Sequence, residues 1–384
     1  MNWVSDLKFL MKGRIDMKLF ICGDTSPICV NNEIENNDIK TLFNDVADVL
    51  RSGDRVIANI ECALTDSDFP IKKKGPNLKA PIKSAEIFKK VGITDCSISN
   101  NHIFDYGVIG VNDTLNAFAQ NGLNYTGFGQ NAEDARKNLV IEKNGVKVAI
   151  IAVCEHEYCY ALEDRMGARA YEAYDTIEDI VKAKKENDYV IILYHGGKEQ
   201  SVYPSPRLRK VGRTMVKHGA DVVLCQHSHC IGCYEEYENG HILYGQGNFH
   251  FIEEGNDHPH WQNGFIVEID IEKELNIKFI PVSVKGNGIE LSKGNDYEQI
   301  MKTFKEQNDN LNNGKWIDGW REFCRENSWY YNIIKDAYTE DAGEDGKETF
   351  AHFLRCEAHL DVWEELCKLP WETEDRIHSE IVKP

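Results

Sequence analysis

The chain has 384 residues, with 44 Lys and Arg against 63 Asp and Glu, which gives a formal net charge of −19. This acidic balance argues against a role in coating nucleic acid, because phosphates would be repelled over most of the surface. No run approaches ~18 consecutive apolar residues, so neither a transmembrane helix nor membrane insertion is predicted. Residues 1–16 lack the continuous apolar core of a signal peptide. We expect them to be a leader segment that contributes little to the folded structure.

The twelve cysteines are scattered along the chain in no disulfide pattern. Several of them lie inside apolar runs, where a free cysteine behaves as a small hydrophobic residue. A chain of this length with such cysteines is typical of a reducing compartment. The sequence therefore predicts a cytoplasmic protein.

Short apolar runs alternate with amphipathic segments between residues 18 and 290. Strands are predicted at residues 18–22, 55–60, 94–99, 146–153, 189–194 and 222–225, and helices at 39–50, 82–91, 108–120, 174–187 and 206–218. This alternation predicts βαβ units and a largely parallel sheet. Two further strands, at 264–271 and 275–284, follow one another without a helix. They predict either an antiparallel addition to the sheet or two sheets packed together.

The composition changes near residue 288. Residues 296–384 hold five of the seven tryptophans and have a helical pattern, clearest at 348–368, with an acidic loop at 339–347. We therefore predict an α/β domain over residues 17–290 and a helical C-terminal extension over residues 296–384.

Polar side chains able to bind metal follow five of the predicted strands. They are Asp24, Glu61, Asn100 with Asn101 and His102, His195, and His227 with His229. A single polar residue after a strand is ordinary loop composition. The carboxyl ends of parallel strands share one edge of a sheet, where ligands bind, so the five tips together predict one site.

The mixture of imidazole and carboxylate predicts divalent Mn, Zn or Fe rather than Ca, which prefers oxygen ligands only. Six donors exceed the roughly three protein ligands of one catalytic zinc ion. We expect one or two ions, with Glu61 as the bridging carboxylate. Such a centre activates water, so we expect it to catalyse hydrolysis at a phosphoryl group.

Several motifs in this order resemble the CapA family, named for poly-γ-glutamate capsule synthesis. They are GD at 23–24, NIE at 59–61, SNNHIFDYG at 99–107, HGGKE at 195–199, QHSHCIG at 226–232 and YGQGNF at 244–249. The resemblance covers residues 18–252. It implies a metallophosphatase-like four-layer α/β/β/α sandwich, related to calcineurin-type phosphoesterases, followed here by the helical extension.

The resemblance also implies roles for single residues. Asp24 and His229 would bind one ion, Glu61 would bridge, and the second ion would take Asn101, His195 and His227. His102 would be the catalytic proton donor, oriented by Asp105. The implied substrate-binding residues are Asn100, Lys74, Lys79, Glu199 and Asn248. Ser26 stands where calcineurin-type enzymes have a histidine ligand, and Glu61 where they have Asp, which leaves the first site one imidazole fewer.

Three other features leave alternatives open. The basic run at residues 72–74 with Lys79 predicts either a solvated loop or anion steering. Cys230 and Cys233 are either a packed pair or a zinc or redox site. The histidines at 250, 258 and 260 either line a substrate mouth or belong to a surface loop. No dinucleotide-binding or P-loop motif and no G-x-S-x-G elbow is present.

The sequence thus predicts a metal-dependent hydrolase, most simply a phosphoesterase, acting on a small phosphoester or an anionic polymer. The alternative is a non-hydrolytic accessory protein of capsule production that binds a polyanion such as poly-γ-glutamate. Cleavage of an amide or γ-glutamyl bond at the same metals is a third possibility. No nucleic-acid partner is predicted, and the oligomeric state is left open.

Overall fold

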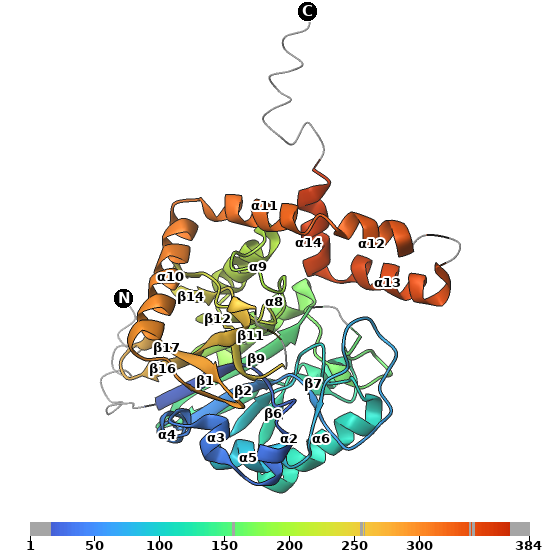
Figure 1. The fold of residues 1–384 in the computed structure, drawn as a ribbon. Helices are drawn as coiled ribbons and strands as arrows, with labels where there is room; N and C mark the ends of the chain where they lie inside the picture. The colour runs from blue at the N-terminus through green and yellow to red at the C-terminus, as the bar shows by residue number, and fades with distance from the viewer. Residues whose placement is uncertain are drawn as a thin grey trace, which may run out of the picture.

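The computed structural model describes residues 17–155, 158–253, 256, 258–337, 339 and 342–368. The expected leader at 1–16 and the last sixteen residues of the expected extension lie outside the described residues. Two large sheets dominate the molecule, and helices lie on both sides of the pair (Figure 1).

The first sheet has eight strands in the order β18-β17-β16-β1-β2-β5-β6, with β15 pairing beside β1. Its members are β1 (Met17–Ser26), β2 (Arg55–Ile60), β5 (Asp95–Ser97), β6 (Asn124–Thr126), β15 (Asn248–Phe251), β16 (Asn263–Ile271), β17 (Leu275–Lys285) and β18 (Gly288–Leu291). Strands β1, β2, β5 and β6 are parallel, whereas β16 pairs with β1 and β17 in antiparallel fashion. Of the two arrangements left open for the strands at 264–271 and 275–284, the antiparallel addition to the sheet is therefore present.

The second sheet has six strands in the order β13-β14-β12-β11-β9-β8. They are β8 (Leu139–Lys143), β9 (Val146–Cys154), β11 (Tyr189–His195), β12 (Val222–Gln226), β13 (Tyr234–Tyr237) and β14 (Gly240–Leu243). Its four central strands are parallel, and antiparallel β8 and β13 form its edges. Two small sheets pair β3 (Ala63–Leu64) with β4 (Lys79–Ala80) and β7 (Phe128–Gly129) with β10 (Gly167–Ala168).

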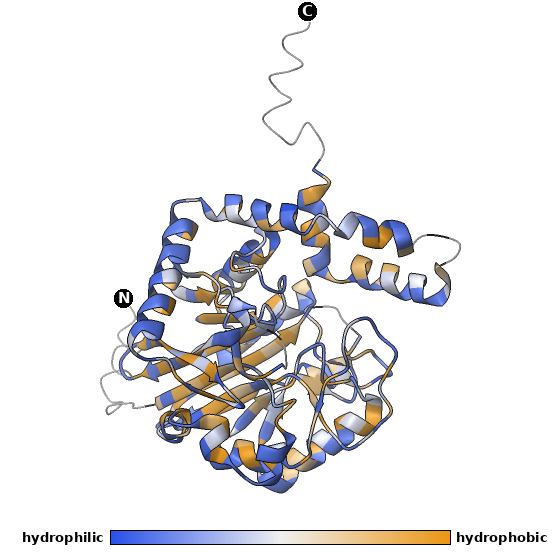
Figure 2. Cartoon of the chain, viewed as in Figure 1, coloured by the Kyte–Doolittle hydropathy of each residue, from blue (hydrophilic) through white to orange (hydrophobic). Residues whose placement is uncertain are grey.

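Alternation along the buried strands explains why the two sheets stack. In β1, Leu19 and Ile21 face the second sheet and pack with residues of β9 and β11, whereas Phe20 and Cys22 face the helices on the other side. Successive strand side chains point to opposite faces, so a strand that is apolar at every position must be covered on both. Figure 2 shows these strands as the most hydrophobic part of the fold, with hydrophilic residues on the surrounding helices.

Helices cover the outer face of each sheet. The first sheet carries α2 (Asn31–Glu35), α3 (Ile39–Phe43), α4 (Val46–Arg51), α5 (Ser84–Val91) and α6 (Gly107–Asn121), and the second carries α8 (Ala173–Glu186) and α9 (Pro206–Lys217). The short α7 (Ala132–Ala135) and the 3-10 turn η1 (Pro259–Gln262) lie in connections. These layers confirm the predicted four-layer α/β/β/α sandwich. The predicted helix at 39–50 is two helices, because Asn44 adopts a positive φ of 38° between them.

The C-terminal part is helical: α10 (Gly294–Asn312), α11 (Trp316–Glu326), α12 (Tyr330–Ala337), α13 (Gly343–Arg355) and α14 (Glu357–Leu366). Phe304 of α10 packs on Phe265 and Phe279 of the first sheet, with ring centroids 4.9 and 5.1 Å away. The predicted single helix at 348–368 is interrupted at Cys356, which is extended, and the predicted acidic loop is partly helical because α13 begins at Gly343. The boundary between two domains stays a prediction.

Candidate metal centre

Strand ends from both large sheets meet at one place. The first sheet contributes Asp24 in β1, Glu61 directly after β2, and residues 100–102 after β5. The second contributes His195 at the end of β11, and His227 and His229 just after β12. All of these side chains except that of Asn101, which is half-buried, are buried. The five predicted strand tips therefore converge, but they come from two facing sheets rather than from the edge of one.

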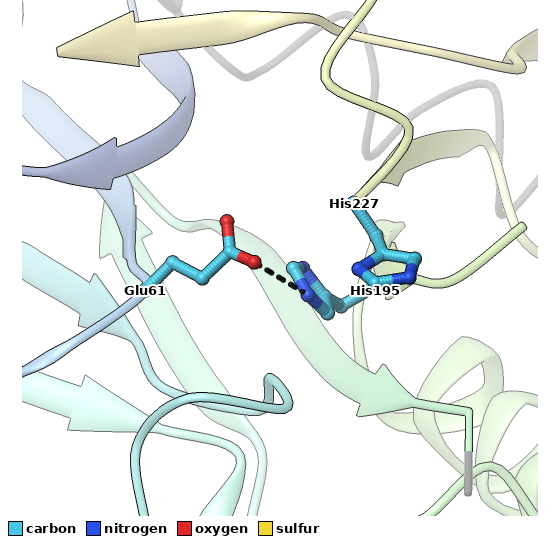
Figure 3. A group of neighbouring side chains, drawn as sticks. All are labelled: Glu61, His195 and His227. Carbon is cyan, nitrogen blue, oxygen red and sulfur yellow. Dashed lines mark ion pairs between the residues drawn. The ribbon is translucent and has the colours of Figure 1, made fainter. Parts of the chain in front are cut away.

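Three overlapping groups, drawn from these residues and Glu199, have ligand atoms close enough to hold an ion. The groups are Asp24 with Glu61 and His229, Glu61 with His195 and His227, and Glu199 with His227 and His229, with ligand atoms within 4.8 Å of one another in each group. Glu61 Oε1 lies 3.3 Å from His195 Nε2 and 4.0 Å from His229 Nε2. Figure 3 shows Glu61 facing His195 and His227 across the gap between the sheets. Glu61 is thus shared by the first two groups, as its expected bridging position requires.

The carboxylate of Glu61 is buried, yet neither of its oxygens forms a hydrogen bond with a described residue. Burial raises its pKa well above the ordinary value, and the neighbouring Asp24 carboxylate raises it further. A buried carboxylate without a partner is costly unless a cation compensates it. The residues present therefore fit a divalent cation.

The three histidines differ in how their surroundings affect their charge. Burial lowers the pKa of His195 to about 4 and holds that of His227 well below the ordinary value. Burial also opposes a charge on His229, but the carboxylates of Glu61 and Asp24 outweigh it and raise its pKa. His195 and His227 are thus neutral near pH 7, the form in which imidazole binds a metal.

Amide side chains contact the candidate ligand groups. Asn59 Nδ2 donates to Asp24 Oδ1 at 2.8 Å and lies 3.0 Å from His195 Nδ1. Asn248 Oδ1 lies 2.9 Å from His229 Nδ1. Partners of this kind fix the orientation of a metal-binding imidazole. Asn59 was missed as a site residue, although it begins the NIE motif. Asn248 contacts a predicted ligand, and its substrate-binding role stays a prediction.

The backbone around the second sheet's candidate ligands is unusual. His227 and His229 have φ values of 81° and 52°, a region that non-glycine residues rarely adopt. The His227 N–H donates to Asp24 Oδ2 at 2.9 Å, which ties this turn to the first sheet. Such backbone persists only where its surroundings enforce it, and it is frequent at functional sites.

His102 is held by a buried charged pair. Its Nδ1 lies 2.7 Å from Asp105 Oδ2, as the expected orienting role requires, and Lys73 pairs with the other oxygen of Asp105. Lys73 Nζ also lies 3.2 Å from His102 Nδ1. Burial and the charge of Lys73 lower the pKa of His102. Lys73, rather than the predicted Lys74, is therefore the residue of the basic run that reaches the site.

The two asparagines after β5 have different contacts. Asn101 Oδ1 lies 2.8 Å from His195 Nε2, among the ligand groups. The amide of Asn100 donates to Asn59 and to the Ile60 carbonyl, and its oxygen accepts the N–H groups of His102 and Ile103. Asn100 thus shapes the turn that presents His102, and its substrate-binding role stays a prediction.

The remaining predicted substrate residues are more dispersed. Lys79 Nζ pairs with Asp68 at 2.9 Å and donates to the Ser67 carbonyl, so its charge is engaged away from the ligand groups. Lys74 contributes a backbone N–H to the Tyr158 hydroxyl at 3.0 Å. Glu199, whose side chain is 48% exposed, lies in a group with His227 and His229.

The structure also places the cysteine pair and one of the histidines for which the sequence left alternatives open. Cys230 and Cys233 are buried, and their thiols donate to the Ser201 and Val202 carbonyls, as a packed pair does. All twelve cysteines are described residues, and none forms a disulfide. His250 is buried against Phe43 with ring centroids 5.0 Å apart, so it does not belong to a surface loop.

Glu155 is a further residue that sequence analysis missed. It directly follows β9, so its signal in the sequence is a carboxylate at a strand end, and it accepts the Tyr194 hydroxyl at 2.7 Å and the Gly197 N–H at 3.0 Å. With His195, His227 and Cys356, it lines a small pocket at the ligand groups. The C-terminal helices therefore reach the site.

The fold and the site define an α/β/β/α protein with a candidate metal centre at the converging strand ends. The family model described as "Bacterial capsule synthesis protein PGA_cap" matches residues 18–253. The chain belongs to this family, as its motifs predicted.

Curated relatives agree with this assignment. The chain is 32% identical to "Capsule biosynthesis protein CapA" of Bacillus anthracis, over 55% of this chain and 53% of that protein. It is 30% identical to "PGA biosynthesis protein CapA" of Bacillus subtilis (strain 168), over 58% of this chain and 60% of that protein. The matched region thus spans between half and two thirds of the length of each relative.

Solved structures give weaker likenesses. A hypothetical protein from Thermus thermophilus aligns with a TM-score of 0.39 and 13% identity, over 71% of this chain and 96% of that chain. A 5′-nucleotidase from Candida albicans aligns with a TM-score of 0.40 and 12% identity, over 71% of this chain and 53% of that chain. At these scores the alignments carry no functional argument.

Proposed function

We propose that this protein is a metal-dependent hydrolase of a phosphoester or a related anionic substrate. The observation that carries the proposal is the buried carboxylate of Glu61, which has no hydrogen-bond partner among the described residues and is surrounded by imidazoles. Asp24, Glu61 and His229 would hold one ion, and Glu61, Asn101, His195 and His227 a second. Divalent cations bound there would lower the pKa of water and polarise phosphoryl oxygens.

His102 supplies the proton in this proposal. Because Asp105 Oδ2 lies 2.7 Å from its Nδ1, Nε2 is the ring nitrogen left to protonate a leaving oxygen. Lys73 pairs with Asp105, and burial together with the charge of Lys73 lowers the pKa of His102. Asn101 Oδ1 lies 2.8 Å from His195 Nε2, and both residues line the small pocket at the ligand groups.

The test begins with the metal content of the purified protein, measured by mass spectrometry. Hydrolysis of p-nitrophenyl phosphate and bis(p-nitrophenyl) phosphate is then assayed with added Mn²⁺, Zn²⁺ or Fe²⁺. We expect bound metal and turnover with at least one ion. Absence of both with all three ions contradicts the proposal. A γ-glutamyl p-nitroanilide in the same panel tests the cleavage of an amide bond.

The second candidate function is a non-hydrolytic role in polymer production. The names of relatives favour it, because they include capsule biosynthesis proteins and a "Probable polyglutamine synthesis accessory protein" of Mycobacterium tuberculosis, 26% identical over 166 residues. Binding of poly-γ-glutamate to metal-free protein, without hydrolysis of any phosphoester, would favour this function. No helix of the described chain is long and apolar enough to cross a bilayer. The cytoplasmic location stays a prediction.

A further inference from the structure

A second cavity, of about 250 Å³, lies between the loop at residues 158–165 and helix α13. Tyr158, Tyr160 and Arg165 line it from the loop, and His352 and Arg355 from the helix. The family match ends at residue 253, so helix α13 lies outside the matched region. The cavity therefore combines a loop of the matched region with the C-terminal helices.

The cavity adjoins the candidate metal centre. Cys356 lines the pocket at the ligand groups, and its N–H donates to the carbonyl of His352, which lines the outer cavity, at 3.1 Å. This bond closes one helical turn, a rise of about 5.4 Å. The end of α13 thus forms a wall between the metal centre and the outer cavity.

Contacts on both sides hold the cavity in shape. The rings of Tyr158 and His352 stack with centroids 5.8 Å apart and an interplanar angle of 13°. Lys72 Nζ pairs with Glu348 and Asp345 of α13 at 2.9 and 3.1 Å. Helix α13 is therefore attached both to the loop at 158–165 and to the basic segment that carries Lys73. A cavity preformed in this way binds with a smaller ordering cost.

The residues that line the cavity include two arginines and no carboxylate, although the chain as a whole is acidic. Arg165 donates to the Tyr160 carbonyl at 2.6 Å and lies 5.9 Å from the Tyr160 ring centroid, which fixes its guanidinium. Neither Arg165 nor Arg355 forms an ion pair with a residue in the described part of the chain. Guanidinium groups bind carboxylates and phosphates through paired hydrogen bonds. Two such groups at one cavity therefore favour an anion.

We infer that the cavity between the loop at 158–165 and α13 is an anion subsite, which binds a carboxylate or phosphate of a substrate that extends beyond the metal centre. The inference rests on the proposed function only in that the substrate is anionic. Arg165 and Arg355 provide the charge, and the stacked Tyr158 and His352 provide a rigid wall. The C-terminal helices thereby select substrates with a second anionic group.

The test measures binding to the full chain by calorimetry, with tri-γ-glutamate and tripolyphosphate as probes, in metal-free and Mn²⁺-loaded protein. The variant is the double substitution Arg165→Gln with Arg355→Gln. The matched control is Arg325→Gln, an exposed arginine of α11 that does not line the cavity. We expect the double substitution to weaken binding of a probe to metal-free protein about ten-fold or more, because each charge-assisted bond is strong. The control should leave binding unchanged.

A second variant, Ala351→Leu, fills the cavity without changing its charge, because Ala351 also lines it. This substitution should weaken the binding of the same probe. If the substitutions weaken the binding of tri-γ-glutamate alone, the subsite binds carboxylates. If they weaken the binding of tripolyphosphate alone, it binds phosphates. Binding that matches the control, or no binding of either probe to the unaltered chain, overturns the inference. Metal loss and inactivity would instead contradict the proposed function, since this binding is measured without metal.

Discussion

At the scale of single residues, Glu61 is the group whose surroundings most need a cation. Its carboxylate is buried without a hydrogen bond to any described residue and stands between two imidazoles. We expect Mn²⁺ or Zn²⁺ at a hundred times its dissociation constant to stabilise the protein by roughly 2.7 kcal/mol. Glu61→Gln should remove most of this stabilisation, because an amide oxygen carries no charge. Thermal unfolding with and without metal measures it.

The control for that measurement is Glu322→Gln, an exposed glutamate of α11. It removes the same charge far from any candidate ligand, so its metal-induced shift should equal that of the unaltered chain. If metal stabilises Glu61→Gln against thermal unfolding as much as it stabilises the unaltered chain, Glu61 is not a ligand.

Also at the scale of single residues, substitution of His102 distinguishes catalysis from metal binding. It contacts Asp105 and Lys73, but it belongs to none of the three groups able to hold an ion among the described residues. His102→Ala should therefore keep its metal while turnover falls by ~10²-fold or more, the scale of a lost general acid. Metal analysis and phosphoester kinetics on one preparation test both parts. Loss of metal would instead make His102 a ligand.

At the scale of elements, β1 places Asp24 through an irregular strand end. The register with β2 shifts between Cys22 and Asp24, and a Cβ added at Gly23 would lie 2.2 Å from the Gly247 carbonyl oxygen. Because that neighbour is backbone, it cannot move aside as a flexible side chain can. Gly23→Ala should lower the free energy of unfolding by about 1–3 kcal/mol and weaken metal binding.

Gly145→Ala provides the comparison, since an added Cβ there meets nothing within 4 Å, although its positive φ adds some strain. Denaturant unfolding and metal titration of both variants should show that only Gly23→Ala weakens the metal site. Equal metal affinities would contradict the role given to this close approach.

Helices α13 and α14 carry a pair of half-buried histidines that predicts a pH dependence. The Nε2 atoms of His352 and His359 are 3.0 Å apart. Burial lowers both pKa values, to about 4 for His352 and about 2 for His359, where Lys198 contributes as well. Below about pH 6.5 the unfolded chain binds protons at these histidines and the folded chain does not. Their stabilisation is therefore complete above pH 6.5 and is lost as the pH falls toward 4.

Each histidine contributes a slope of up to about 1.4 kcal/mol per pH unit in that range. We expect His359→Gln to reduce the difference in unfolding free energy between pH 7 and pH 5. The exposed His218, changed to Gln, serves as the reference. If the two variants show the same pH dependence, the pair of His352 and His359 is not its source.

At the scale of the whole molecule, the candidate metal centre joins the two sheets. Asp24 and Glu61 come from the first sheet, and His195, His227 and His229 from the second. Metal should therefore slow hydrogen exchange at the ends of β1 and β2 and equally at the ends of β11 and β12, because opening either sheet would break ligand bonds. Protection confined to one sheet would contradict a shared centre.

Much of the fold follows from local pattern. The run RVIANI predicts β2 with its observed bounds, and the helices at 174–187 and 206–218 differ from α8 and α9 by one residue at most at each end. The predicted helix at 39–50 differs from the structure because Asn44 has a positive φ that separates α3 from α4. Amino-acid composition does not reveal such backbone geometry. The short strands β13 to β15 were not predicted, because they depend on pairing with distant strands.

The sequence by itself determined the residue types at the strand ends and the order of its motifs, since apolar runs and their polar ends are local features. Only the tertiary structure decided that these ends come from two facing sheets, that Lys73 rather than Lys74 reaches His102, and that Cys356 lines the site. Those facts depend on contacts between segments far apart in the chain. No periodicity within a segment specifies which distant side chain it will meet.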